Sequence, residues 1–119
     1  MNNETCIDPT ALERIRGIGG DDLLTKMIAL FIQNVEKRLR EASEGKAAGD
    51  SEAVGRAAHS IKSSSGNVGA VRLQRIAQEI ERLAMEGNIR RATDRIAELE
   101  GAFSEVKAHL TGKGEPSER

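Results

Sequence analysis

The sequence predicts an all-α protein, an antiparallel four-helix bundle with a short extra helix at its N-terminal end. Its apolar residues are mostly Ala, Leu, Ile and Val, and only two of its 119 residues, both Phe, are aromatic. This composition suits helices that pack through aliphatic stripes better than it suits sheet faces. Apolar residues also recur at spacings of three and four in four long segments, which glycine clusters separate. Such brief connections are typical of antiparallel helical neighbours.

The first two predicted helices are separated by glycines. A short helix begins at Asp8-Pro9, an N-cap residue followed by a proline at the first helical position. We expect it to end near Arg16, because the glycine-rich run 17–20 follows. The acidic pair Asp21-Asp22 then begins a long helix, where the helix dipole favours negative charge. This helix should break around residues 45–49. Its apolar stripe comprises Leu24, Ile28, Phe31, Val35, Leu39 and Ala42.

Three further helices complete the predicted bundle. The third follows Asp50, a predicted N-cap, and loosens at residues 66–69. Its inward residues are Val54, Ala57, Ile61 and Ser64. The fourth runs from about residue 71 to 85. Its stripe comprises Leu73, Ile76, Ala77, Ile80 and Leu83. Gly87-Asn88 ends that helix and caps a fifth, which we expect to be unbroken. The fifth carries Ile89, Ala92, Ile96, Leu99, Phe103, Val106 and Leu110.

We expect one domain over residues 8–111, with flexible termini at 1–7 and 112–119, because this length supports a single core. One cysteine, Cys6, excludes an intrachain disulfide and fits a reducing compartment. With no signal peptide and no apolar run near the roughly 20 residues of a membrane span, the protein is predicted to be cytoplasmic. A net charge of −1 and few aromatic rings argue against nucleic-acid binding. We expect a monomer.

His59 is the residue most suited to chemistry. Advancing about 100° per residue places it opposite the apolar side of the third helix, so it should project into solvent. Its neighbours three, four and seven positions away are mostly small. They are Gly55, Arg56, Lys62, Ser63 and Gly66. Neutral imidazole has a nucleophilic nitrogen near pH 7, and Lys62 could offset the charge of a phosphoryl group. An isolated exposed histidine is, however, more often an ordinary surface residue.

The residues around His59 resemble a known motif. Ala58-His59-Ser60-Ile61-Lys62, followed by small residues and Asn67-Val68-Gly69, is similar to the phosphorylation-site signature of histidine-containing phosphotransfer (HPt) domains. The resemblance covers about residues 8 to 110. It includes Gly19-Gly20-Asp21, the turn Ala48-Gly49-Asp50 and the run Ile80-Glu81-Arg82-Leu83. This coverage makes the resemblance more specific than a short motif alone.

The resemblance implies roles for individual residues. His59 would be the phosphoacceptor, and Lys62 would stabilise the phosphoryl group. Ser63, where glycine is usual in the family, and Gly66 would keep the docking surface open. A polar residue of the adjacent helix commonly hydrogen-bonds the imidazole, and the matching position is Glu81, with Gln78 one turn before it. A carboxylate there would fix the tautomer of the ring, although Glu81 could equally be an ordinary solvated residue.

The resemblance also implies partners and a mechanism. His59 would accept a phosphoryl group from an aspartyl-phosphate and donate it to another receiver domain, of a response regulator or a hybrid sensor kinase. We expect no cofactor on this chain, and Mg²⁺ on the partner receiver. The sequence lacks a glycine-rich phosphate loop, so we expect no autokinase activity. The alternative is a non-catalytic module that binds receivers or kinases without phosphate turnover. The presence of both His59 and Lys62 favours the relay.

Overall fold

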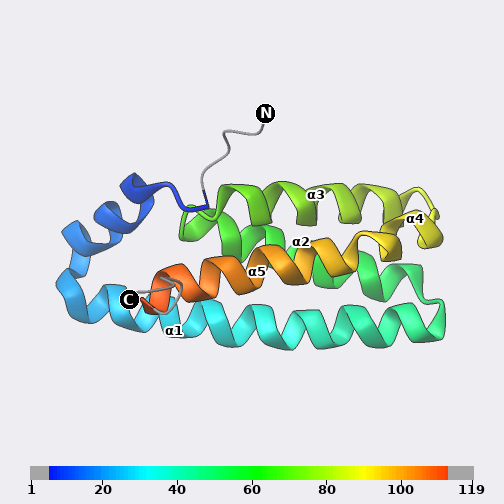
Figure 1. Cartoon of the computed structure of the whole chain (residues 1–119), viewed down its shortest axis with the longest axis horizontal. Coiled ribbons are helices and arrows are strands. Elements are labelled where there is room, and N and C mark those ends of the chain that lie inside the picture. Colours follow the sequence, from blue (N-terminus) through cyan, green and yellow to red (C-terminus); the bar gives the residue numbers. More distant parts are fainter. Residues whose placement is uncertain (1–5, 113–119) are drawn as a thin grey trace, which may run out of the picture.

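The computed structural model describes residues 6–112 and confirms the predicted all-α bundle (Figure 1). Its helices are α1 (Pro9–Ala48), α2 (Ser51–Asn67), α3 (Val71–Met85), α4 (Ile89–Asp94) and α5 (Ile96–Thr111). The long part of α1, α2, α3 and the α4–α5 pair run antiparallel along the longest axis of the molecule. Helix α2 packs against both α1 and α3, and α5 closes the bundle against the same two helices.

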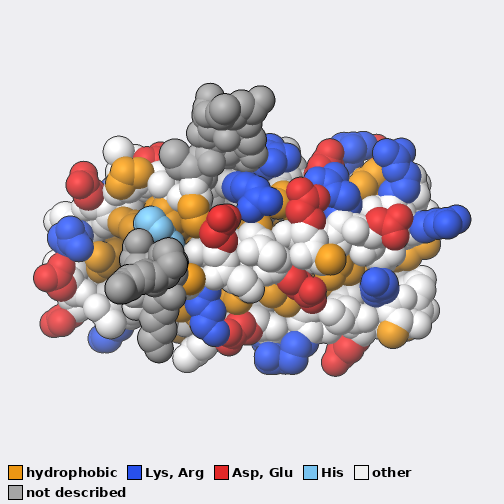
Figure 2. All heavy atoms as spheres, in the orientation of Figure 1, with side chains coloured by type: hydrophobic (Ala, Val, Ile, Leu, Met, Phe, Trp, Pro, Cys, Tyr) orange, Lys and Arg blue, Asp and Glu red, His pale blue; other side chains and the backbone are white. Residues whose placement is uncertain are grey.

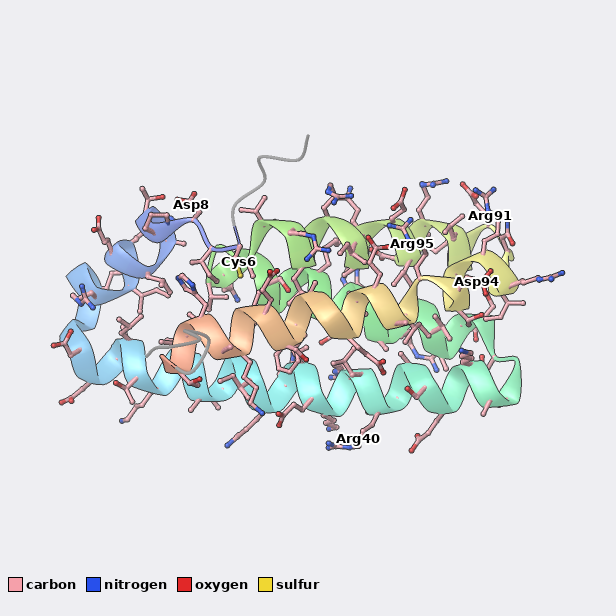
Figure 3. The ribbon with its side chains drawn as sticks, in the orientation of Figure 1. Cys6, Asp8, Arg40, Arg91, Asp94 and Arg95 are labelled. Carbon is pink, nitrogen blue, oxygen red and sulfur yellow. The ribbon has the colours of Figure 1, made fainter. Side chains whose placement is uncertain are left out.

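Helix α1 contains the predicted short N-terminal helix and the long second helix, joined by a kink. The Asp8 carboxylate caps the start by accepting a hydrogen bond from the Thr10 backbone N–H at 3.0 Å (Figure 3). Helical geometry continues past residue 16 and is interrupted only at Gly20, with φ 75° and ψ −168°. Glycine adopts this conformation without steric cost. The predicted break over 17–20 is therefore a kink at one residue.

The glycine-rich break predicted at 45–49 is wrong in its extent. Helix α1 continues through Gly45 and ends at Gly49, whose φ of 66° is a left-handed C-cap. Gly45 is buried, and a Cβ atom built there would lie 2.9 Å from Cγ2 of Val54. This glycine allows α1 and the start of α2 to approach each other, and it does not end a helix.

The fifth predicted helix is divided in two. Arg95 lies between α4 and α5, where its guanidinium makes ion pairs with Glu79 of α3 and with Glu98 (Figure 3). The apolar spacing crosses this junction without interruption, so it could not reveal the division. The buried members of the predicted stripe on the two sides are Ala92, Ile96, Leu99, Phe103 and Val106.

The core is aliphatic, with one aromatic pair formed by Phe31 and Phe103, whose ring centroids lie 6.0 Å apart. In α2 the predicted inward Ser64 is only half-buried, whereas Ser65 is fully buried. Ile7, predicted to belong to a flexible terminus, is 7% exposed and joins the core. Cys6 packs against the core and Gly112 is the C-cap of α5, although both were predicted to be flexible. Residues 1–5 and 113–119 lie outside the described part.

The surface is mixed in charge. On the face shown in Figure 2, basic and acidic side chains alternate, and the basic ones are most frequent toward the α3–α4 end. Within residues 6–112, no helix combines the length and apolar character needed to cross a membrane.

Candidate functional site

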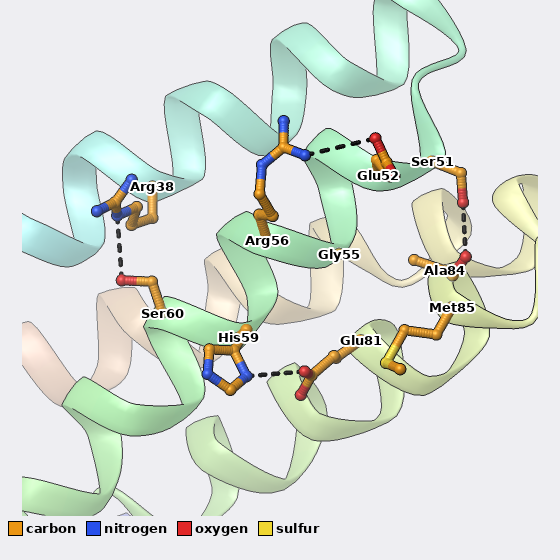
Figure 4. Close-up of a pocket in the computed structure, with 10 residues that line it drawn as sticks. All are labelled: Arg38, Ser51, Glu52, Gly55, Arg56, His59, Ser60, Glu81, Ala84 and Met85. Atoms are coloured by element: carbon orange, nitrogen blue, oxygen red, sulfur yellow. Dashed lines mark hydrogen bonds and ion pairs between the residues drawn. The ribbon is translucent and has the colours of Figure 1, made fainter.

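His59 projects from the middle of α2 into a hollow between α1, α2 and α3 (Figure 4). Its side chain is 60% exposed, as the helix geometry predicts. We call this depression the His59 hollow. The side chains that line it with His59 include Arg38 of α1, Arg56 and Ser60 of α2, and Glu81 and Met85 of α3.

Glu81 holds one edge of the imidazole. Its Oε2 lies 2.8 Å from His59 Nδ1, across the contact between α2 and α3 (Figure 4). A carboxylate can only accept a hydrogen bond, so the neutral ring must carry its proton on Nδ1. The other nitrogen, Nε2, then keeps its lone pair and makes no hydrogen bond to the described residues. The ring is therefore oriented with its nucleophilic nitrogen free.

Lys62 shares the same carboxylate. Its Nζ lies 2.7 Å from Glu81 Oε1, and both side chains are mostly buried, Lys62 at 28% and Glu81 at 16% exposure. Burial alone would raise the pKa of Glu81, but the hydrogen bonds from Lys62 and His59 outweigh it and lower the pKa. Glu81 is thus ionised at neutral pH. The sequence places Lys62 beside His59 but does not reveal its ion pair with Glu81.

The other predicted site residues are not brought together. Ser63 is exposed, consistent with an open surface. Gln78 is exposed too, but among the described residues no hydrogen bond joins it to His59. The expectation that Gly66 keeps the docking surface open stays a prediction, and the structure adds a packing role for this glycine. A Cβ at that position would lie 2.7 Å from Nε2 of Gln74, so Gly66 makes room for a side chain of α3.

The last glycine of the motif also has a structural reason. Gly69 has a φ of 72°, and its carbonyl accepts a hydrogen bond from the Asp8 backbone N–H at 2.7 Å. A Cβ at Gly69 would lie 2.8 Å from the Asp8 carbonyl oxygen. This glycine therefore allows the N-terminal segment to dock on the α2–α3 turn.

A second polar network, which the sequence reasoning missed, lies on the other side of α2. Arg38 Nε donates a hydrogen bond to Ser60 Oγ at 3.0 Å (Figure 4), and Asn34 Nδ2 donates one to Ser64 Oγ at 2.6 Å. Ser60 and Ser64 are one helical turn apart, so both face α1. The spacing of these two serines, four residues apart, was the feature of the sequence that could have indicated this network. Arg38 also pairs with Glu41 at 2.8 Å.

Within residues 6–112, no group of three or more His, Cys, Asp or Glu side chains is placed to hold a metal ion. The site instead consists of one oriented imidazole, one carboxylate and one ammonium group on an open helical face. This combination in an antiparallel helical bundle is the arrangement of a histidine phosphotransfer module.

Comparisons with known proteins identify the family. The model of the Hpt domain matches residues 26–109. A crystal structure of histidine-containing phosphotransfer protein B (HptB) from Pseudomonas aeruginosa PAO1 is similar with a TM-score of 0.87 at 28% identity, covering 98% of this chain and 100% of that one. Among curated protein sequences there is no significant match. The chain belongs to the Hpt domain family and is a histidine phosphotransfer protein.

Proposed function

We propose that His59 relays a phosphoryl group between the aspartates of two receiver domains. The observation that carries this proposal is the exposed His59 ring, whose Nδ1 is engaged by Glu81 while Nε2 is left free. Proteins of the Hpt family act as phosphotransfer intermediates, which supports the general reaction.

The proposed step is an in-line displacement at phosphorus. Nε2 of His59 forms the new N–P bond, the bond from phosphorus to the aspartyl oxygen breaks, and the aspartate leaves as a carboxylate. The ring becomes cationic because the Nδ1 proton stays in its hydrogen bond to Glu81. The reverse displacement passes the phosphoryl group to a second receiver. Positioning and charge neutralisation dominate such loose transition states, so no acid–base residue is required.

Lys62 supplies the charge that this step needs. It lies three residues after His59, and its ammonium group shares a carboxylate with the imidazole. Because residues three apart share a helix face, Lys62 is placed to offset negative charge on the arriving phosphoryl group. The divalent metal belongs to the receiver. We propose that this chain does not phosphorylate itself and that receivers of response regulators or hybrid kinases are its partners.

The test is phosphate transfer from a phosphorylated receiver domain in the presence of Mg²⁺. We expect an acid-labile, base-stable phosphate that mass spectrometry maps to His59. The His59→Gln variant should lose all labelling, with helicity and melting temperature near those of the unmodified protein. His109→Gln is the matched control, because His109 is also exposed on a helix, and it should label normally.

Two results would contradict the proposal. Labelling that survives in His59→Gln would place the phosphoacceptor elsewhere. Failure of labelling across several receivers that nevertheless bind would favour the interaction module without phosphate turnover.

A further inference from the structure

Met85 combines high exposure with proximity to the site. It is the last residue of α3, one turn after Glu81, and it is 78% exposed. It lines the His59 hollow, and it also lines a second hollow with Lys62 and Arg82 on the other side of Glu81. Met85 therefore places a flexible apolar side chain between the two hollows, among mostly polar residues (Figure 4).

The chemistry of transfer requires a partner to cover this region. A phosphoryl group moves directly from aspartate to Nε2, so the partner surface must reach into the His59 hollow. Specific protein contacts bury about 800 Å² on each partner. That area is far larger than the area of one imidazole ring, so the contact must extend over the residues around His59. Met85, as a wall of the same hollow, therefore lies within the contact.

We propose that Met85 is a docking anchor for the receiver domain that exchanges phosphate with His59. This inference rests on the proposed function and specifies the surface of the partner. That surface should carry an apolar recess for Met85 beside the acidic residues of its phosphorylation site. The opposite rim of the hollow carries two arginines. Arg38 is paired with Glu41 at 2.8 Å, whereas the pair between the exposed Arg56 and Glu52 is long at 3.6 Å, so Arg56 is the cation that an acidic partner surface can engage.

The choice of methionine has a physical consequence. Its unbranched, polarisable side chain adapts to differently shaped apolar recesses, which suits a surface that meets more than one partner. A relay protein needs at least a donor and an acceptor. Met85 would contact the donor and the acceptor receivers in the same way. It would contribute to docking and not to the chemical step.

The matched variants are Met85→Ala and Ile18→Ala. Ile18 is equally exposed, at 76%, but lies by the α1 kink, at the opposite end of the bundle from the end of α3 (Figure 1). Transfer from a phosphorylated receiver is measured over a range of concentrations of this chain. We expect Met85→Ala to raise KM about tenfold, the equivalent of ~1.4 kcal/mol, with kcat unchanged, as loss of a docking contact requires. Met85→Leu should restore KM, and Ile18→Ala should leave it unchanged.

A rise in KM below threefold for Met85→Ala, or an equal rise for Ile18→Ala, would overturn the proposal. Receiver binding without phosphate, measured by titration calorimetry, separates this inference from the proposed function. If Met85→Ala weakens binding while the unmodified protein takes up no phosphate, the anchor stands and the relay fails. If labelling of His59 is normal and Met85→Ala binds like the unmodified protein, the anchor alone fails.

Discussion

Two polar networks flank α2, and they differ in what α2 contributes: titratable groups on one side and hydroxyl groups on the other. Toward α3, the Glu81 carboxylate lies between the His59 imidazole and the Lys62 ammonium group. Toward α1, the Ser60 hydroxyl accepts a hydrogen bond from Arg38. His59 and Ser60 are consecutive, and the helical rotation of about 100° is enough to give them different neighbours. The charged side can respond to a proton or a phosphoryl group, whereas the hydroxyl side holds α2 against α1. Substitutions on the two sides should therefore affect different properties.

The largest effect is expected for Glu81→Ala. Loss of the carboxylate frees the imidazole to adopt either tautomer and removes the partner of Lys62. We expect phosphoryl acceptance to slow about 10- to 100-fold, by analogy with the loss of a hydrogen-bond partner that orients a metal-ligating histidine. A quenched time course of labelling by a phosphorylated receiver measures this rate. Glu81→Gln keeps an oxygen that accepts the hydrogen bond from His59 Nδ1. Its rate of phosphoryl acceptance should therefore lie between that of Glu81→Ala and that of the unmodified protein. A rate within twofold of the unmodified protein for Glu81→Ala would show that Glu81 does not position the ring.

A smaller effect on the same side is expected for Lys62→Ala. Removing the ammonium group leaves the His59–Glu81 hydrogen bond in place but removes a positive charge near the phosphoryl group. We expect transfer to slow, or the phosphohistidine lifetime to shorten, about fivefold to tenfold. Lys26→Ala, at an exposed position of α1, is the control. Unchanged rate and lifetime would remove Lys62 from the mechanism.

On the α1 side, Ser60→Ala should act on stability. The variant removes the acceptor of Arg38 and should cost about 1 kcal/mol in the free energy of unfolding, the net value of a typical hydrogen bond. Urea titration followed by circular dichroism measures this loss. The rate of phosphoryl acceptance should stay within twofold. A large loss of rate without a loss of stability would mean that this network serves the reaction.

The sequence was sufficient for features that depend on one helix at a time. Helix α3 spans the predicted residues 71–85, because its apolar period and flanking glycines agree. The exposure of His59 follows in the same way from the period of α2. Features that depend on the contact between two helices could not be predicted as well from the sequence. A glycine that admits a neighbouring helix, such as Gly45, looks in the sequence like one that ends a helix.

The candidate site shows the same division. Resemblance alone pointed to Glu81, because its position against His59 depends on how α3 is rotated against α2. The ion pair between Lys62 and Glu81 depends on that rotation as well. The contact of Gly66 with Gln74 was not visible either, because Gln74 comes from the next helix. Spacing within α2 cannot contain this information.

The smallest expected effect concerns pH and sharpens the account of the charged side. Burial opposes ionisation of Glu81, but the hydrogen bonds from Lys62 and His59 prevail, so its pKa in the folded protein lies below the ordinary value of 4.5. A lowered carboxyl pKa contributes stability that is present above that ordinary value and is lost as the pH falls through the folded pKa. Glu81→Gln should therefore be less stable than the unmodified protein by at most about 1 kcal/mol at pH 7, since the glutamine oxygen still accepts a hydrogen bond and only the charge is lost. The gap should close on acidification below about pH 4.5.

Thermal melting of both proteins from pH 7 to pH 3 measures this gap. Repeating the comparison in a Lys62→Ala background should reduce the gap at pH 7, because the Lys62 hydrogen bond contributes more to the lowered pKa of Glu81 than the His59 hydrogen bond does. A gap that is the same at every pH would mean that the charge of Glu81 does not contribute to stability. Its hydrogen bonds would then serve to hold the His59 ring in place and not to hold α2 against α3.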